Sequence, residues 1–282
     1  MDCIMYAVDR SSWFYGDCRL QSEISQGWLV VWSCSCQVMC LILLFILVLV
    51  LQPDQKDKVT LADVYFSMVF FPLLAFAAVA ASLELRHDVQ SRWQGTCFWS
   101  ELYLVLYVSR MMCHIVVQPM TEMGPYLLFM MTIHHLISMG CYIIGLGYGR
   151  CHYWGCLDGC CEITTVFLNV LYLFNMPLEE GKLKDQIPHW LEATISFALW
   201  LAFLVFRLML FPYWIYTFRQ DMHQRPELTR GITTSLERFI YPGTTGILLF
   251  LSSMWFIPIT QGMLKTLRKS KKSKVTKVTK VT

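Results

Sequence analysis

Charged side chains are scarce in this sequence. Of its 282 residues, 15% are Asp, Glu, Lys or Arg and 56% are hydrophobic, whereas an ordinary soluble domain has roughly 25% charged residues. The mean hydropathy of the whole chain is +0.47. This composition excludes a disordered chain, a coiled coil and a small disulfide-stabilised scaffold. It predicts a polytopic membrane protein.

Polar stretches long enough to form an inserted soluble domain are also missing. The chain instead contains seven continuous apolar runs, each long enough to cross a ~30 Å hydrocarbon core as a helix. The runs do not alternate apolar and polar residues, which argues against a β-barrel. We therefore expect an all-α membrane protein with about seven transmembrane helices, six of them forming one bundle. The expected spans are Trp28–Leu51, Leu61–Ser82, Phe98–Val117, Tyr126–Tyr148, Cys156–Met176, Leu191–Phe211 and Ile240–Ile259.

Acidic residues are absent from the C-terminal segment 263–282, which carries eight Lys or Arg. We divide the chain into an N-terminal segment with the first membrane anchor (1–60), a six-helix domain (61–262) and this basic tail (263–282). The tail is expected to be disordered and to lie near an anionic lipid surface. It has no interleaved aromatic residues, so we expect no nucleic-acid binding.

Two of the apolar runs carry polar side chains at helical spacing. An ionisable side chain at the bilayer centre costs about 2.5–3.5 kcal/mol on insertion scales, so such residues should face the bundle interior. Steps of three or four residues predict one polar stripe on each helix. The stripe of the third run is Ser100, Tyr103, Tyr107, Arg110, His114 and Gln118, and that of the fifth run is Asp158, Glu162, Thr165 and Asn169.

The fourth run contains two adjacent histidines, His134 and His135, and the sixth contains Arg207. Adjacent helical residues point about 100° apart, so at most one imidazole can face straight into a central cavity. We expect Glu162 and Asp158 to be the counter-ions of the two buried arginines. A histidine has a pKa near 6.5 and can serve as base, nucleophile or acid, and Glu162 is placed to fix its tautomer. The structural alternative is a buried ion-pair network without chemistry.

Together these residues resemble a known family. His134-His135 within one span, the cluster Glu162–Thr165 leading to Asn169, and the segment that starts at Arg207 are similar to the TLC-domain proteins, which include the ceramide synthases. The likeness covers about 200 residues, from Leu61 to Gly262. It implies a bundle of six helices around a lipid-sized cavity, with the histidine pair deep inside.

The sequence also departs from the ceramide synthases. Those enzymes carry His-Asp about 27 residues after the histidine pair and a second Asp three residues further on, where this chain has Cys161-Glu162 and Thr165. One carboxylate is therefore present, but the neighbouring His and the second Asp are not. The chain resembles the ceramide-synthase-like members of the family more than a true synthase.

The resemblance implies a role in lipid metabolism or membrane-lipid homeostasis, in the endoplasmic reticulum or alternatively the plasma membrane. By analogy with the synthases, the activity would be transfer of a fatty acyl group from acyl-CoA, the co-substrate, to a sphingoid base, with no permanently bound cofactor or metal. The partners implied are a long-chain acyl or sphingoid lipid and the membrane, and a homodimer is left open. The implied catalytic residues are His134, His135 and Glu162. The implied substrate-binding residues are Tyr107, Arg110, His114, Asp158, Thr165, Asn169 and Arg207.

Other functions fit the sequence less well. A non-catalytic lipid binder or sensor is the main alternative. A proton-coupled transporter would use the same acids and histidines, but the chain lacks an internal repeat. A seven-helix receptor lacks support, because Ser109 rather than an acid precedes Arg110. His152, Cys156 and Cys160 are spaced four residues apart, and we interpret them as packing residues rather than zinc ligands.

Overall fold

The computed structural model describes residues 14–52, 57–121, 124–175, 177–178, 181–182 and 187–278. In the described residues the chain is helical apart from one pair of two-residue strands, β1 (Pro177–Leu178) and β2 (Gly181–Lys182), which are antiparallel. The all-α prediction is confirmed. The longer helices are α1 (Phe14–Leu51), α2 (Lys58–Leu85), α4 (Phe98–Val117), α5 (Pro125–Tyr148), α7 (Glu162–Asn175), α9 (His189–Phe203), α10 (Leu210–Gln224) and α12 (Ser235–Val278). The shorter ones are α3 (Val89–Gln94), η1 (Gln118–Met120), α6 (His152–Gly159), η2 (Leu204–Met209) and α11 (Pro226–Thr229).

Seven helical stretches are long and apolar enough to span a membrane, and they coincide with the seven predicted runs. Most are longer than predicted because helix caps lie beyond the apolar residues. Asp57, for example, caps α2 by accepting a hydrogen bond from the backbone N–H of Thr60, an arrangement that stabilises helix N-termini. At the other end of the chain, α12 continues to Val278, into the segment for which the sequence predicts a disordered tail.

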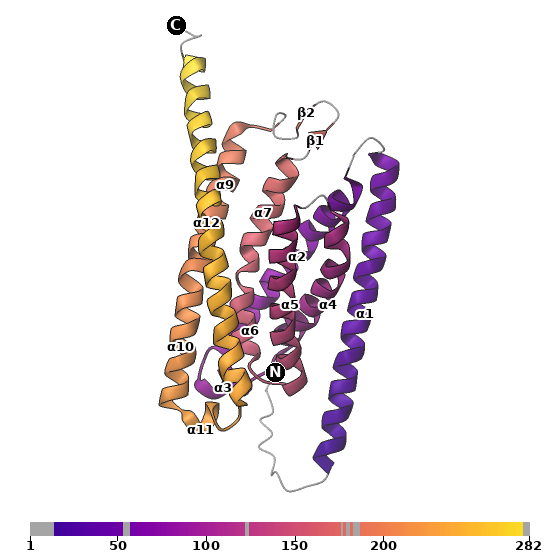
Figure 1. Cartoon of the computed structure of the whole chain (residues 1–282), viewed down its shortest axis with the longest axis vertical. Helices are drawn as coiled ribbons and strands as arrows, with labels where there is room; N and C mark the ends of the chain where they lie inside the picture. Colours follow the sequence, from indigo (N-terminus) through magenta and orange to yellow (C-terminus); the bar gives the residue numbers. More distant parts are fainter. Residues whose placement is uncertain are drawn as a thin grey trace.

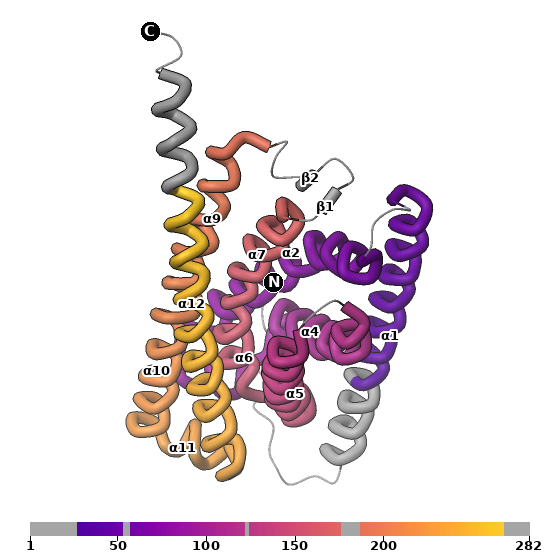
Figure 2. The backbone as a smooth tube through the Cα atoms, turned by 45° about the horizontal axis from the view of Figure 1, so that its top comes forward, coloured from indigo at the N-terminus to yellow at the C-terminus, as the bar shows by residue number. Residues whose placement is uncertain are grey.

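The helices stand roughly parallel, with α1 at one edge of the molecule and α9, α10 and α12 at the other (Figure 1). Figure 2 shows α4 and α5 between these edges. The main apolar core is formed by α2, α4, α5 and α6, and it includes the fully buried Leu74, Tyr103 and Leu104. A second cluster of buried aromatic residues, Trp93, Trp154, Trp214 and Phe218, fills the end of the bundle near α3 and α11. This aromatic layer closes that end of the interior.

Helix α5 ends where a left-handed residue reverses the chain. Gly149 has φ 59°, and its backbone N–H donates to the carbonyls of Gly145 and Leu146. Only glycine adopts this conformation without steric cost, and it is the usual residue at such a helix end. The reversal places α6 next to α5 and brings Asp158 towards the bundle interior.

The fifth predicted span is two helices rather than one. Helix α6 ends at Gly159 and α7 begins at Glu162, with a turn at Cys160 and Cys161 between them. The spacing of Asp158 and Glu162 predicts that both belong to one regular helical stripe. This prediction is wrong, because the turn places them in two different helices. The sequence pattern does not reveal the turn, because Asp158 and Glu162 keep a helical spacing across it and no proline marks the break.

Candidate functional site

The polar stripe of α4 faces the protein interior, as its spacing predicts. Tyr103, Tyr107 and Arg110 are buried, and the two tyrosine rings lie against Tyr142 of α5, with Tyr107 and Tyr142 centroids 4.5 Å apart. Edge-to-face packing of this kind stabilises aromatic clusters beyond the area they bury. The tyrosines form a rigid wall between α4 and α5.

Arg110 is paired with an acid that the sequence interpretation did not single out. Its guanidinium donates to Asp63 Oδ1 of α2 at 2.7 Å and to Ser67 Oγ at 2.9 Å. The expectation that Glu162 or Asp158 neutralises Arg110 is therefore wrong. Asp63 also lies 3.4 Å from His114 Nε2 through its other oxygen, so this one carboxylate holds two residues of the α4 stripe.

The histidine pair lies beside this ion pair. The ring centroids of His114 and His135 are 5.3 Å apart, and those of His134 and His135 are 5.2 Å apart. His135 is 5% exposed, and neither of its ring nitrogens has a hydrogen-bond partner in the described part of the chain. Nδ1 of His134 is likewise buried and unpaired. Buried polar atoms are normally hydrogen-bonded, so the unpaired ring nitrogens of His135 are an exception within the described residues.

Glu162 and Arg207 lie on the other side of the bundle interior. Glu162 Oε2 accepts a hydrogen bond from Thr165 at 2.7 Å, and Arg207 Nε donates to Thr164 Oγ1 at 2.9 Å. Thr164 and Thr165 are adjacent in α7, so the side chains that they contact lie in the same region of the interior. Glu162 is thus near Arg207 as predicted, although they form no direct ion pair in the described structure.

Glu162 forms no hydrogen bond with either histidine in the described residues. The carboxylate nearest the histidine cluster is instead Asp63, which reaches it through His114. The tautomer-fixing role predicted for Glu162 has no hydrogen bond to support it.

A π-helical segment, η2, brings Arg207 into the interior. The segment Leu204–Met209 joins α9 to α10, and the Arg207 guanidinium lies 5.1 Å from the Phe203 ring centroid. Pro212 follows three residues later; it lacks an N–H and its ring opposes the carbonyl of Leu208, which the wider π-turn accommodates.

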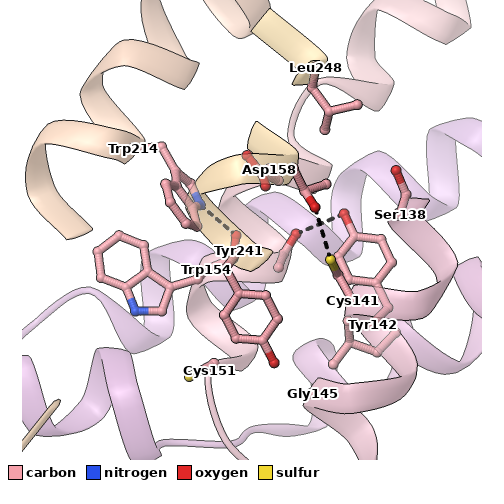
Figure 3. Close-up of a pocket in the computed structure, with 13 residues that line it drawn as sticks. Ser138, Cys141, Tyr142, Gly145, Cys151, Trp154, Asp158, Trp214, Tyr241 and Leu248 are labelled. Carbon is pink, nitrogen blue, oxygen red and sulfur yellow. Dashed lines mark hydrogen bonds between the residues drawn. The ribbon is translucent and has the colours of Figure 1, made fainter. Parts of the chain in front are cut away.

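A small cavity lies between α5, α6, α10 and α12, next to Asp158 (Figure 3). Its volume is about 30 Å³, enough for roughly one or two water molecules and smaller than the lipid-sized cavity that the resemblance implies. Asp158 Oδ2 accepts from Thr245 Oγ1 at 2.9 Å, while Oδ1 has no partner in the described residues. Ser138 Oγ and Tyr241 OH at this cavity are also buried and unpaired.

Comparison with known protein families identifies the chain. A family model of the TLC domain matches residues 23–261. The chain belongs to the TLC-domain family. No curated protein and no solved structure matches it. The sequence interpretation assigns the six-helix domain to residues 61–262. The family match begins earlier, at residue 23, and therefore includes most of α1.

The other residues that the sequence singled out in this TLC-domain chain each have different surroundings. Thr165 contacts Glu162, one turn away on α7. Asn169 lies further along α7, and its side-chain nitrogen is buried without a partner in the described residues. His152 shares a 3.1 Å hydrogen bond with Ser100 Oγ, and no group of three potential metal ligands occurs among the described residues.

Two interior residues of the TLC domain were missed from the sequence. Asp63 stands inside the second predicted span, and an acid within a span is itself a signal that a buried partner exists. Ser138 of α5 is not among the site residues that the sequence predicts. The structure places it at the cavity beside Asp158.

Proposed function

We propose that this TLC-domain protein binds a long-chain lipid inside its helical bundle and acts in lipid metabolism or membrane-lipid homeostasis at the endoplasmic reticulum. The observation that carries the proposal is the state of His135, which is buried and has both ring nitrogens unpaired. A buried imidazole without partners costs free energy that a bound polar group recovers. The polar head of a lipid, brought in laterally from the bilayer, supplies such a group.

The reaction we propose is acyl transfer from acyl-CoA to the amine of a sphingoid base. Neutral His135 accepts the amine proton while the nitrogen attacks the thioester carbonyl, so that an N–C bond forms and the C–S bond breaks. The proton then passes from His135 to the leaving thiolate of coenzyme A. Within this proposal His134 is the second imidazole at the reacting centre, and Arg207 and Glu162 bind polar atoms of the substrates together with Tyr107, Asp158, Thr165 and Asn169.

Arg110 and His114 have a different role in this scheme from the substrate-binding role that the family resemblance implies. Both are held by Asp63, and His114 packs against His135. They therefore position His135 rather than bind the head group directly.

A non-catalytic lipid binder or sensor is the second candidate. It is favoured by one observation: His135 has no hydrogen-bonded carboxylate in the described residues, whereas a catalytic base is commonly oriented by such a group. Both candidates predict lipid in the same interior site, but only the first predicts turnover.

An acyl-transfer assay separates the two candidates. Microsomes with the wild-type protein are supplied with a labelled long-chain acyl-CoA and a sphingoid base, alongside His135→Asn and the control His87→Asn, an exposed histidine between α2 and α3. We expect N-acylated product from wild type and from His87→Asn, and a decrease of at least about 100-fold in His135→Asn. Wild-type protein that binds lipid without forming product overturns the enzymatic proposal and supports the binder. Absence of both product and bound lipid overturns both.

A further inference from the structure

Helix α10 has two faces of different character. Phe211, Trp214, Phe218 and Asp221 are buried and recur at steps of three or four residues, so they form the inward face. Trp214 lines the interior cavity on this side. The opposite face is turned away from the bundle interior and borders α12, which lies beside α10 at the edge of the molecule (Figures 1 and 2).

A groove of about 660 Å³ runs along this outer face. The lining residues all come from one face of α10 and from α12: Pro212, Ile215, Tyr216, Arg219, Gln220, His223 and Leu249. Because α10 separates the groove from the interior cavity, the groove is a different site from the one proposed above.

The chemistry of the groove changes in order along α10. Pro212 and Ile215 are apolar, Tyr216 is amphipathic, and Arg219 and His223 are polar or basic. With a rise of 1.5 Å per residue, positions 212 to 223 cover about 16 Å, which is close to half of a ~30 Å hydrocarbon core. The groove therefore matches one leaflet of a bilayer in length and in its order from acyl chain to head group.

The basic end of the groove is not neutralised by the protein. Arg219 is exposed and has no ion-pair partner among the residues that the structure describes. The acid nearest in sequence, Asp221, is on the inward face, where it accepts hydrogen bonds from Arg92 at 2.6 and 2.8 Å and from Trp93 Nε1 at 3.1 Å. Glu227 in α11 lies 3.9 Å from Arg225. An anion from outside the protein is the complementary partner for Arg219.

We propose that this groove binds a phospholipid with an anionic head group. Its acyl chain lies along Pro212, Ile215 and Leu249, and its phosphate is bound by Arg219 and His223. Arginine binds phosphate through charge-assisted, often bidentate hydrogen bonds. The inference does not depend on the function proposed for the interior site.

Native mass spectrometry of the full chain released from lipid nanodiscs tests the proposal. The nanodiscs contain phosphatidylcholine with or without phosphatidic acid. We expect wild type to retain phosphatidic acid in preference to phosphatidylcholine, and Arg219→Gln to lower that retention by about tenfold, equivalent to about 1.4 kcal/mol. Ile215→Trp fills the apolar part of the groove and is expected to lower retention without changing any charge.

Arg230→Gln is the matched control, because Arg230 is exposed at the same end of the bundle but does not line the groove. Equal loss in Arg219→Gln and Arg230→Gln would show general attraction to acidic lipid and would overturn the site. Equal retention of both lipids by wild type would overturn it as well, as would a dimer whose second copy excludes lipid from the groove. Thermal unfolding of each variant identifies any loss of lipid retention that is caused by misfolding. The proposal requires that Ile215→Trp and Arg219→Gln both retain less phosphatidic acid than wild type while they remain folded.

Discussion

Arg110 of α4 and Asp63 of α2 are joined by a 2.7 Å ion pair inside the membrane-spanning bundle. The Arg110 side chain is fully buried, with its guanidinium 4.9 Å from the Phe66 ring centroid. Burying such a charge is costly unless it is paired. The pair therefore fixes the relative position of α2 and α4 and, through His114, the surroundings of His135.

Removing the acid of this pair should destabilise the protein strongly. Asp63→Leu leaves an uncompensated arginine in the interior, and we expect a loss of about 3 kcal/mol in the free energy of unfolding. Denaturant unfolding of the purified protein in detergent measures it. The double variant Asp63→Leu/Arg110→Met replaces both charges by apolar groups, and it should recover most of the stability. A double variant no more stable than Asp63→Leu would contradict a direct pairing.

The close approach of α6 to α4 predicts that a larger residue at Gly159 destabilises the protein. A Cβ added at Gly159 would overlap the ring and hydroxyl of Tyr103, which is fully buried and packed against Tyr107 and Tyr142. Gly159→Ala should therefore lower the free energy of unfolding by about 1–3 kcal/mol through overpacking. Gly140→Ala in α5, where an added Cβ meets nothing within 4 Å, is the control and should be neutral or slightly stabilising. Similar losses in both variants would show that helix approach is not the cause.

The ion pair between the α5–α6 turn and the start of α12 determines how the stability of this part of the fold depends on pH. Arg150 donates to both oxygens of Glu237, at 3.0 and 2.6 Å. Burial works against the charge of Arg150, but the hydrogen bond and the negative charge of Glu237 outweigh it and raise the pKa of Arg150 above its usual value. Because the folded pKa is raised, this stabilisation is complete below the unfolded pKa of arginine and does not vary around neutral pH.

Arg150→His should introduce a pH dependence at this position. A histidine beside Glu237 gains a raised pKa in the folded state, so its stabilisation is present below about 6.5 and is lost as pH rises through the folded value. The unfolding temperature of Arg150→His should be higher than that of the uncharged control Arg150→Gln at acid pH. The two unfolding temperatures should converge at alkaline pH. A constant difference between them would contradict the ion pair.

Much of the fold could be predicted from the sequence, because membrane helices are marked by apolar length. All seven spans were identified, and the spacing of Tyr103, Tyr107 and Arg110 correctly gave the inward face of α4. The break at Cys160 and Cys161 could not be predicted, since Asp158 and Glu162 on either side of it keep a helical spacing and no proline marks the turn. The π-helix at Leu204–Met209 was not predicted either, because its form depends on tertiary packing.

The candidate site was predicted less completely than the fold. Helical spacing shows which residues share a face, but not which neighbouring helix that face contacts. Depth in the membrane favoured Glu162 as the partner of Arg110, whereas the packing of α2 against α4 brings Asp63 there instead. His135 has His114 as a neighbour, and Glu162 forms no hydrogen bond with the histidine pair in the described residues.

Binding of the polar part of a lipid by His135 within the bundle is the basis of the proposed function. Its most direct test is mass spectrometry of the lipid that co-purifies with wild type, with His135→Asn and with His87→Asn, all expressed in the same cells and extracted in the same mild detergent. Wild type and His87→Asn should carry a long-chain lipid at close to one molecule per chain, and His135→Asn should lose most of it while remaining folded. Equal lipid in wild type and His135→Asn, or wild type without bound lipid, would contradict the claim.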